Sequence, residues 1–68
     1  MAPPASRIRA MLLAFDRLTD RALETMLDDL RPSTIRSARV RLWRSGAIQR
    51  AGFVRGEKRW EAAWKLSQ

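Results

Sequence analysis

Arginine and serine side chains gather between residues 31 and 46, and they are the groups in this sequence best suited to binding chemistry. If this stretch is an α-helix, its residues follow one another at about 100° around the axis. One side of the helix then holds Ser33, Arg36, Ser37, Val40 and Arg44. That side contains no carboxylate. Guanidinium groups can fork onto guanine edges and phosphates, and serine is small enough to let a helix approach another molecule closely. A helix with such a side is shaped to enter a groove of a nucleic acid.

Four of these positions have a predicted role, and two of them also have an alternative. Arg36 can fork onto O6 and N7 of a guanine, and the alternative is an ordinary surface arginine. Val40 can touch a thymine methyl group, and the alternative is a place at the edge of the core. Ser33 and Ser37 can form hydrogen bonds to a phosphate or a base.

Phosphate contacts are predicted beside these positions. We expect Arg41 and Arg44 to meet phosphates. The backbone amides of Ser33 and Thr34, at the start of the helix, form a further phosphate site. The alternative for Thr34 is an ordinary hydroxyl group at a helix N-terminus.

A second group of cations follows around Gly52 and Gly56. Its members are Arg50, Arg55, Lys58 and Arg59. On a flexible hairpin tip these charges would follow an adjacent groove or the phosphate backbone. The alternative is a charged hairpin that resists edge-to-edge strand pairing.

Charge is distributed unevenly along the chain. The 68 residues have a net charge of +7, and twelve of the fourteen cations are arginine. Residues 1–30 hold four arginines and five acids, whereas residues 31–68 hold ten cations and two acids. The second half therefore favours a polyanionic partner, and the alternative is a solvated basic surface that only keeps the protein soluble.

Catalytic and metal-binding functions are disfavoured by the residue types. Without cysteine or histidine the chain has no disulfide, no thiolate or imidazole metal ligand and no histidine base. Asp28 and Asp29 are neighbours that point apart, and Glu57 and Glu61 lie among cations, so no acid pair for catalysis is visible. We expect no enzyme activity, no cofactor, no metal and no small-molecule substrate.

The length and hydropathy of the chain predict one intracellular domain. At 68 residues it is one domain at most. No apolar run approaches the roughly 20 residues that cross a bilayer, and residues 1–6 lack the apolar core of a signal peptide. We expect a cytoplasmic protein without a membrane partner.

Apolar periodicity predicts two helices in the first half, after a flexible tail over residues 1–5. Ser6 is the expected N-cap of the first helix, whose apolar stripe ends at Phe15. Thr19 is the expected N-cap of the second helix, which should end around residues 28–29.

A third helix is predicted from Pro32, in its first turn, to Gly46, a natural helix stop. Strands are then predicted over residues 47–50 and 59–66, and the second alternates apolar and polar residues. A tight turn at Gly56-Glu57 is predicted in the segment between them. The alternative for the last segment is a C-terminal helix.

The predicted core combines the apolar sides of these elements. Its members are Ile8, Met11, Leu12, Phe15, Leu23, Met26, Leu27, Ile35, Ala38, Leu42, Ile48 and Trp64. Trp43 is expected beside Trp64, where helix and sheet pack, and Trp60 is left open between packing and base stacking.

Four short segments resemble the winged helix-turn-helix family. Leu18-Thr19 is similar to the opening of the family's second helix, and residues 32–36 (Pro-Ser-Thr-Ile-Arg) to the opening of its recognition helix. Residues 42–48 (Leu-Trp-Arg-Ser-Gly-Ala-Ile) resemble the junction with the first wing strand, and residues 64–66 (Trp-Lys-Leu) the end of the last one. The resemblance implies an α+β, mostly α fold, with a three-helix helix-turn-helix core and a β-hairpin wing in one domain over residues 6–68.

Two features depart from the pattern of that family. The turn before the third helix, residues 28–31, lacks the usual glycine and is about one residue longer. Position 39, on the inner side of the helix, is arginine rather than the common leucine. Arg39 must therefore reach outward or pair with an acid, for which Asp16, Asp20 and Glu24 are the candidates.

The resemblance implies a sequence-preferring protein of double-stranded DNA, acting in transcription regulation by occupying a site. The third helix, about residues 32–45, would lie in the major groove, and the basic wing on the adjacent backbone or minor groove. We expect a monomer or a dimer that forms on DNA. The alternatives are a protein-binding module that docks an acidic partner, and a small DNA-bending recombination or architectural factor.

Overall fold

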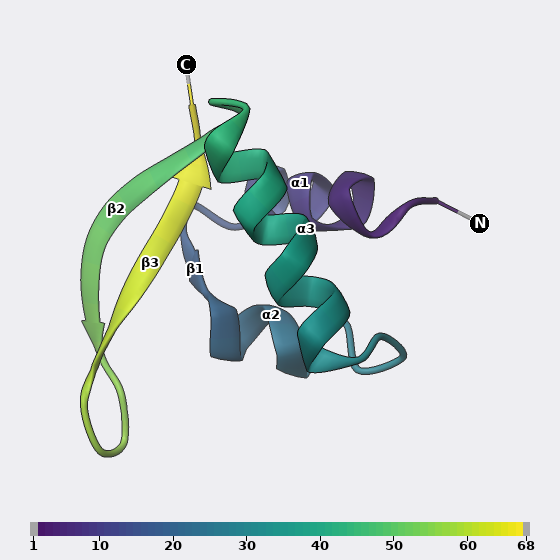
Figure 1. Ribbon diagram of the computed structural model, residues 1–68. Coiled ribbons are helices and arrows are strands. Elements are labelled where there is room, and N and C mark those ends of the chain that lie inside the picture. The colour runs from purple at the N-terminus through teal and green to yellow at the C-terminus, as the bar shows by residue number, and fades with distance from the viewer. Residues whose placement is uncertain (1, 68) are drawn as a thin grey trace.

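The computed structural model describes residues 2–67, which combine three helices with a three-stranded antiparallel sheet in an α+β arrangement (Figure 1). The order along the chain is α1 (Pro4–Ala14), β1 (Leu18–Thr19), α2 (Asp20–Met26), α3 (Pro32–Arg44), β2 (Ile48–Arg55) and β3 (Trp60–Leu66). In the sheet, β3 lies between β1 and β2. Within the described residues no helix is long and apolar enough to cross a membrane.

Helix α1 begins earlier than the sequence predicted. Pro3 is its N-cap and Pro4 its first residue, so Ser6 lies inside the helix and is not the cap. Proline suits this position because its missing N–H would have no partner in the first turn. Part of the expected tail is thus helical, and residue 1 lies outside the described residues.

Helix α2 starts as predicted and ends sooner. The hydroxyl Oγ1 of Thr19 accepts a hydrogen bond from the Ala22 amide at 3.1 Å, which confirms Thr19 as the N-cap. The helix ends at Met26 and is followed by a turn, so its predicted extension to residues 28–29 was too long. Strand β1, which precedes it, was not predicted, because two residues are too few to show a period.

Helix α3 has the predicted boundaries. Pro32 lies in its first turn, and Arg31 provides no side-chain cap. At the other end Gly46 has a φ of 83°, the left-handed conformation that glycine adopts without strain. Its amide donates to the Trp43 carbonyl at 3.0 Å, and the Ala47 amide donates to the Leu42 carbonyl at 2.9 Å. These two bonds form a Schellman motif, which satisfies carbonyls that the helix end leaves open.

The C-terminal segment forms the predicted hairpin and not a helix. Strands β2 and β3 pair from Ile48 with Leu66 to Arg55 with Trp60. The turn holds residues 56–59, with the Gly56 amide donating to the Arg59 carbonyl at 2.8 Å, so the predicted two-residue turn at Gly56-Glu57 was wrong. Figure 1 shows the hairpin tip projecting away from the helices.

Most of the predicted core is buried. Nine predicted members are buried: Ile8, Leu12, Leu23, Leu27, Ile35, Ala38, Leu42, Ile48 and Trp64. Met11 is only partly buried, and Phe15 and Met26 are exposed; Phe15 follows the end of α1, and Met26 is the last residue of α2. Leu18 and Ala63 are buried although they were not predicted.

Candidate nucleic-acid interface

Helix α3 presents the predicted side to solvent. Its apolar side chains Ile35, Ala38 and Leu42 are buried, which fixes the rotation of the helix about its axis. Five predicted site residues on it are exposed: Ser33, Arg36, Ser37, Arg41 and Arg44. Thr34 and Val40 are half-buried, so Val40 lies nearer the edge of the core than the other predicted contacts.

Arg39 lies on the inner side of α3, and its charge is paired with Asp20. Its Nε donates to Oδ1 of Asp20 at 2.9 Å and its Nη2 to Oδ2 at 2.7 Å, in a two-pronged ion pair. The side chains are only 12% and 27% exposed. The Arg39 guanidinium also lies 4.4 Å from the ring centre of Trp64. Of the three candidate partners, Asp20 is therefore the one used, and the contact joins α2, α3 and β3.

A second stack connects α3 to the hairpin. The rings of Trp43 and Trp64 lie 5.2 Å apart at 59°, which confirms the predicted contact between helix and sheet. The Arg50 guanidinium lies 5.2 Å from the Trp43 ring and 5.9 Å from the Trp64 ring. Arg50 is nevertheless exposed, so it combines packing on the tryptophans with a surface charge.

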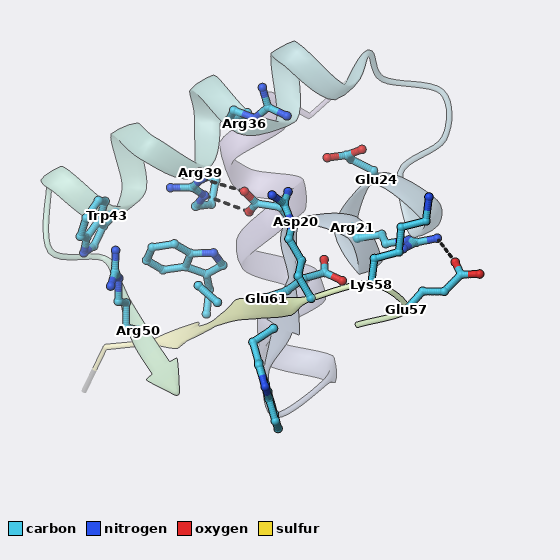
Figure 2. Close-up of a pocket in the computed structure, with 14 residues that line it drawn as sticks. Asp20, Arg21, Glu24, Arg36, Arg39, Trp43, Arg50, Glu57, Lys58 and Glu61 are labelled. Atoms are coloured by element: carbon cyan, nitrogen blue, oxygen red, sulfur yellow. Dashed lines mark hydrogen bonds and ion pairs between the residues drawn. The ribbon is translucent and has the colours of Figure 1, made fainter. Parts of the chain in front are cut away.

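An open groove runs between α2, α3 and the hairpin, and Figure 2 shows the side chains that line it. Arg36, Arg50 and Lys58 contribute cations to this groove. Glu24 and Glu61 contribute acids, and Glu57 at its rim receives a hydrogen bond from Arg21 at 3.2 Å. The groove is therefore mixed in charge, unlike the outward side of α3.

The opposite flank of α3 carries hydroxyl groups and one cation. Ser33, Thr34, Ser37 and Arg41 line a shallow hollow there, together with the backbone and side chains of residues 3–5. All of the described residues that line it are uncharged except Arg41. Arg41 and the predicted phosphate site at Ser33 and Thr34 therefore lie together, beside the N-terminus of α1, whereas Arg44 does not line this hollow.

The hairpin brings its predicted cations to the surface. Arg55, Lys58 and Arg59 are exposed near the tip. The Arg55 guanidinium lies 5.5 Å from the ring of Trp60, which is itself exposed and packs in no core. Trp60 thus belongs to this surface, and the question that the sequence left open is settled against core packing.

Sequence reasoning missed one residue that shapes the hairpin. Nη1 of Arg17, in the loop after α1, donates to the Ala51 carbonyl at 3.0 Å. This contact lies at an irregularity of β2, where Gly52 has a φ of 81°. No local signal marks Arg17 for this role, because the contact spans 34 positions of the chain.

Ion pairs in the described residues use arginines outside the predicted site. They join Arg7 to Asp29, Arg21 to Glu57 and Arg39 to Asp20. The predicted site cations form no ion pair within residues 2–67; they are Arg36, Arg41, Arg44, Arg50, Arg55, Lys58 and Arg59. The acids are thus partly neutralised elsewhere, and the site keeps its positive charge for a ligand.

The Arg7–Asp29 pair lies outside the candidate interface and fixes α1 to the turn before α3. Nη1 of Arg7 donates to Oδ2 of Asp29 at 2.6 Å, and Nη2 donates to Oδ1 at 2.9 Å. These hydrogen bonds lower the pKa of the Asp29 carboxyl and raise the pKa of Arg7.

Metal ligands are not brought together in the part of the chain that the structure describes: residues 2–67 contain no group of three acids that could hold an ion. No protein-family model matches the sequence, and no curated protein matches it significantly. The chemistry of the surface itself is therefore the guide to function.

Proposed function

We propose that this chain is a winged helix-turn-helix protein that binds double-stranded DNA with sequence preference and regulates transcription by occupying its site. In this proposal α2 and α3 form the helix-turn-helix, α3 enters the major groove, and the hairpin of β2 and β3 is the wing. DNA is the partner that matches both the shape of α3 and its charge.

One observation carries the proposal: seven cations on α3 and the hairpin have no carboxylate partner in the described residues, whereas three other arginines are paired with acids. Unpaired surface arginines cost little in water and bind phosphates with release of counterions. Four cations outside the predicted site also form no ion pair within residues 2–67, namely Arg9, Arg17, Arg31 and Lys65, so the proposal rests on the grouping of the seven on one helix and one hairpin.

The polar side of α3 supplies the means of reading sequence. Arg36 is exposed and forms no ion pair within residues 2–67, so its fork can reach O6 and N7 of a guanine. Ser33 and Ser37 are small and exposed on the flank of α3 opposite the groove that Arg36 lines, so they let the helix backbone approach the bases. Phosphate contacts from Arg41 and Arg44 would then fix the register of the helix.

The acids of the groove limit how DNA can bind. Glu24 and Glu61 line the groove between α2, α3 and the hairpin together with several cations, so a phosphate would be repelled close to these two acids. The duplex would therefore contact the exposed polar side of α3 and the distal hairpin, with Arg36, Arg50 and Lys58 reaching it from the lining of the groove. In this proposal the two contacts lie on neighbouring grooves of one face of the duplex.

The proposal is tested by comparing two arginine variants on a preferred duplex and on random duplex. Arg36→Ala is expected to cost about 1–3 kcal/mol of binding free energy on the preferred site and much less on random duplex. Arg41→Ala is expected to weaken binding to both duplexes alike, and to reduce the salt slope of log K by about 1.

Arg9→Ala is the matched control, because Arg9 is an exposed arginine on α1 outside the proposed interface. It should leave both affinities close to wild type. Equal losses on both duplexes for Arg36→Ala would show that Arg36 contacts phosphate and not a base. Absence of duplex binding by the wild-type protein would refute the proposed function.

A further inference from the structure

The distal half of the hairpin exposes large apolar side chains that the core does not use. Phe53 is 58% exposed, Trp60 60% and Val54 38%. Exposing these side chains in so small a protein forgoes apolar burial that would stabilise the fold. Large apolar side chains that are grouped on a surface mark a contact with another molecule.

Strand register places the two aromatic rings on one face. Phe53 pairs with Ala62, and Arg55 pairs with Trp60. Residues that face each other across the strands share a face, so Phe53 and Trp60 are diagonal neighbours. Val54 pairs with Glu61 and lies on the other face.

A β-bulge brings Phe53 to this face. Arg50 pairs with Trp64, and the next pair along the ladder is Phe53 with Ala62, so β2 contains one extra residue between them. Without that residue Gly52 would pair with Ala62, and Val54 would pair with Trp60. Because of the bulge, the diagonal neighbour of Trp60 is therefore Phe53 and not Gly52.

Two features hold the bulge in place. Gly52 adopts a φ of 81°, which other residue types rarely adopt. Nη1 of Arg17 donates to the Ala51 carbonyl at 3.0 Å, from a loop in a different part of the chain. The position of Phe53 is thus built into the fold and is not left to a flexible tip.

The charge around the rings indicates the class of partner. Arg55 lies over the Trp60 ring at 5.5 Å, and Lys58 and Arg59 follow in the turn. The same turn and strand also hold two acids, Glu57, which is paired with Arg21, and Glu61, so cations outnumber acids around the rings. An apolar pair with this net positive surround complements a surface that is apolar at its centre and anionic at its edges. The minor groove of DNA has this character, with sugars and base edges between two rows of phosphates.

We infer that Phe53 and Trp60 form an apolar wedge that enters the minor groove beside the α3 site, partly unstacks one base step and bends the duplex. This inference rests on the proposed function, and it adds what the hairpin does to the DNA. Apolar side chains inserted in this way kink a duplex by about 20–90° toward the major groove.

The test measures DNA bending by energy transfer between the two labelled ends of a duplex that carries the preferred site. Wild type should bend the duplex by about 20° or more. Phe53→Ala and Trp60→Ala should lose most of the bend while still binding the site. Phe53→Leu should keep the bend, because leucine is also an effective wedge. Val54→Ala is the matched control and should behave as wild type.

A second duplex separates unstacking from simple apolar contact. A mismatch at the base step under the hairpin lowers the cost of opening that step. Wild type should bind this duplex about tenfold more tightly than the matched one, and the doubly substituted Phe53→Ala/Trp60→Ala protein should show no such preference. Circular dichroism checks that each variant is folded.

Two results would overturn the inference while leaving the proposed function intact. One is site binding by wild type without a bend. The other is a bend that persists in the doubly substituted protein, which would assign the apolar pair to a protein partner. Failure of the proposed function is a different result, namely no duplex binding by any form of the protein.

Discussion

At the scale of single residues, Arg39 is the contact on which the orientation of α3 depends. Its guanidinium is held by both carboxylate oxygens of Asp20 and lies over the ring of Trp64. A leucine at this position would fill the same space without a preferred direction. The charged contact instead ties α3 at once to α2 and to the middle strand of the sheet, and adds to the apolar burial that fixes the rotation of the helix.

Breaking this pair should destabilise the fold. Asp20→Asn leaves the Arg39 charge largely buried and poorly paired, at an expected cost of about 1–3 kcal/mol in the free energy of unfolding. Arg21→Ala, which breaks the exposed pair with Glu57, is the control and should cost about 0–1 kcal/mol. Urea denaturation measures both values. A cost for Asp20→Asn no larger than that of the control would contradict the role given to Arg39.

The Arg7–Asp29 pair should make stability depend on acid pH. An unfolded aspartate titrates near pH 3.9, and hydrogen bonds from Arg7 lower the pKa of Asp29 in the folded protein. The unfolded state therefore binds more protons between these two values, so the stabilisation is complete above the unfolded pKa and is lost as the pH falls through the folded pKa.

Asp29→Asn removes this pH-dependent stabilisation. Wild type should have the higher midpoint of urea unfolding at pH 6, and the two midpoints should converge as the pH falls below that of unfolded aspartate. Asp28→Asn is the control, because Asp28 forms no ion pair in the described part of the chain. A difference between wild type and Asp29→Asn that stays constant down to the lowest pH would contradict this assignment.

At the scale of elements, Gly46 determines where α3 ends and where the hairpin starts. A Cβ added there would meet no atom within 4 Å, so only the backbone conformation disfavours other residues. Gly46→Ala should therefore destabilise the protein by about 1–2 kcal/mol, and Gly46→Asn should cost less because asparagine tolerates a positive φ. Thermal or urea unfolding compares the two variants. Equal costs would show that space and not backbone conformation constrains this position.

Local signals predicted the elements whose physics is local. Thr19 and Gly46 act at helix ends through contacts a few residues away, and both were predicted correctly. The start of α1 was misplaced because Pro3 and Pro4 offer a helix start that competes with the cap expected at Ser6. Apolar periodicity also predicted Phe15 and Met26 as members of the core. Phe15 lies just beyond the end of α1, and Met26 is the last residue of α2.

Other features depend on distant parts of the chain and left no local trace. Strand β1 has only two residues and exists because Leu18 and Thr19 pair with Trp64 and Ala63. The bulge at Gly52 depends partly on Arg17, and the partner of Arg39 could be narrowed to three acids but not chosen. In contrast, the sequence did predict that the site cations are grouped on one helix and one hairpin, and the structure exposes them there.

At the scale of the whole molecule, charge is sorted by position as well as by amount. Of the twelve arginines, those paired with acids are Arg7, Arg21 and Arg39, and these pairs connect elements of the fold. The seven predicted site cations of α3 and the hairpin form no ion pair in the described residues and project from these two elements. The fold thus uses three arginines to hold its parts together and leaves the seven predicted site cations exposed on α3 and the hairpin.

The measurement that tests the central claim most directly is selection of binding sites from a random duplex library at near-physiological salt. The proposal predicts an enriched motif a few base pairs long, which contains a guanine and loses its enrichment with Arg36→Ala. Uniform, salt-sensitive binding without a motif would contradict sequence recognition by α3 and indicate a protein that reads only the backbone. No retention of any duplex would contradict DNA binding altogether.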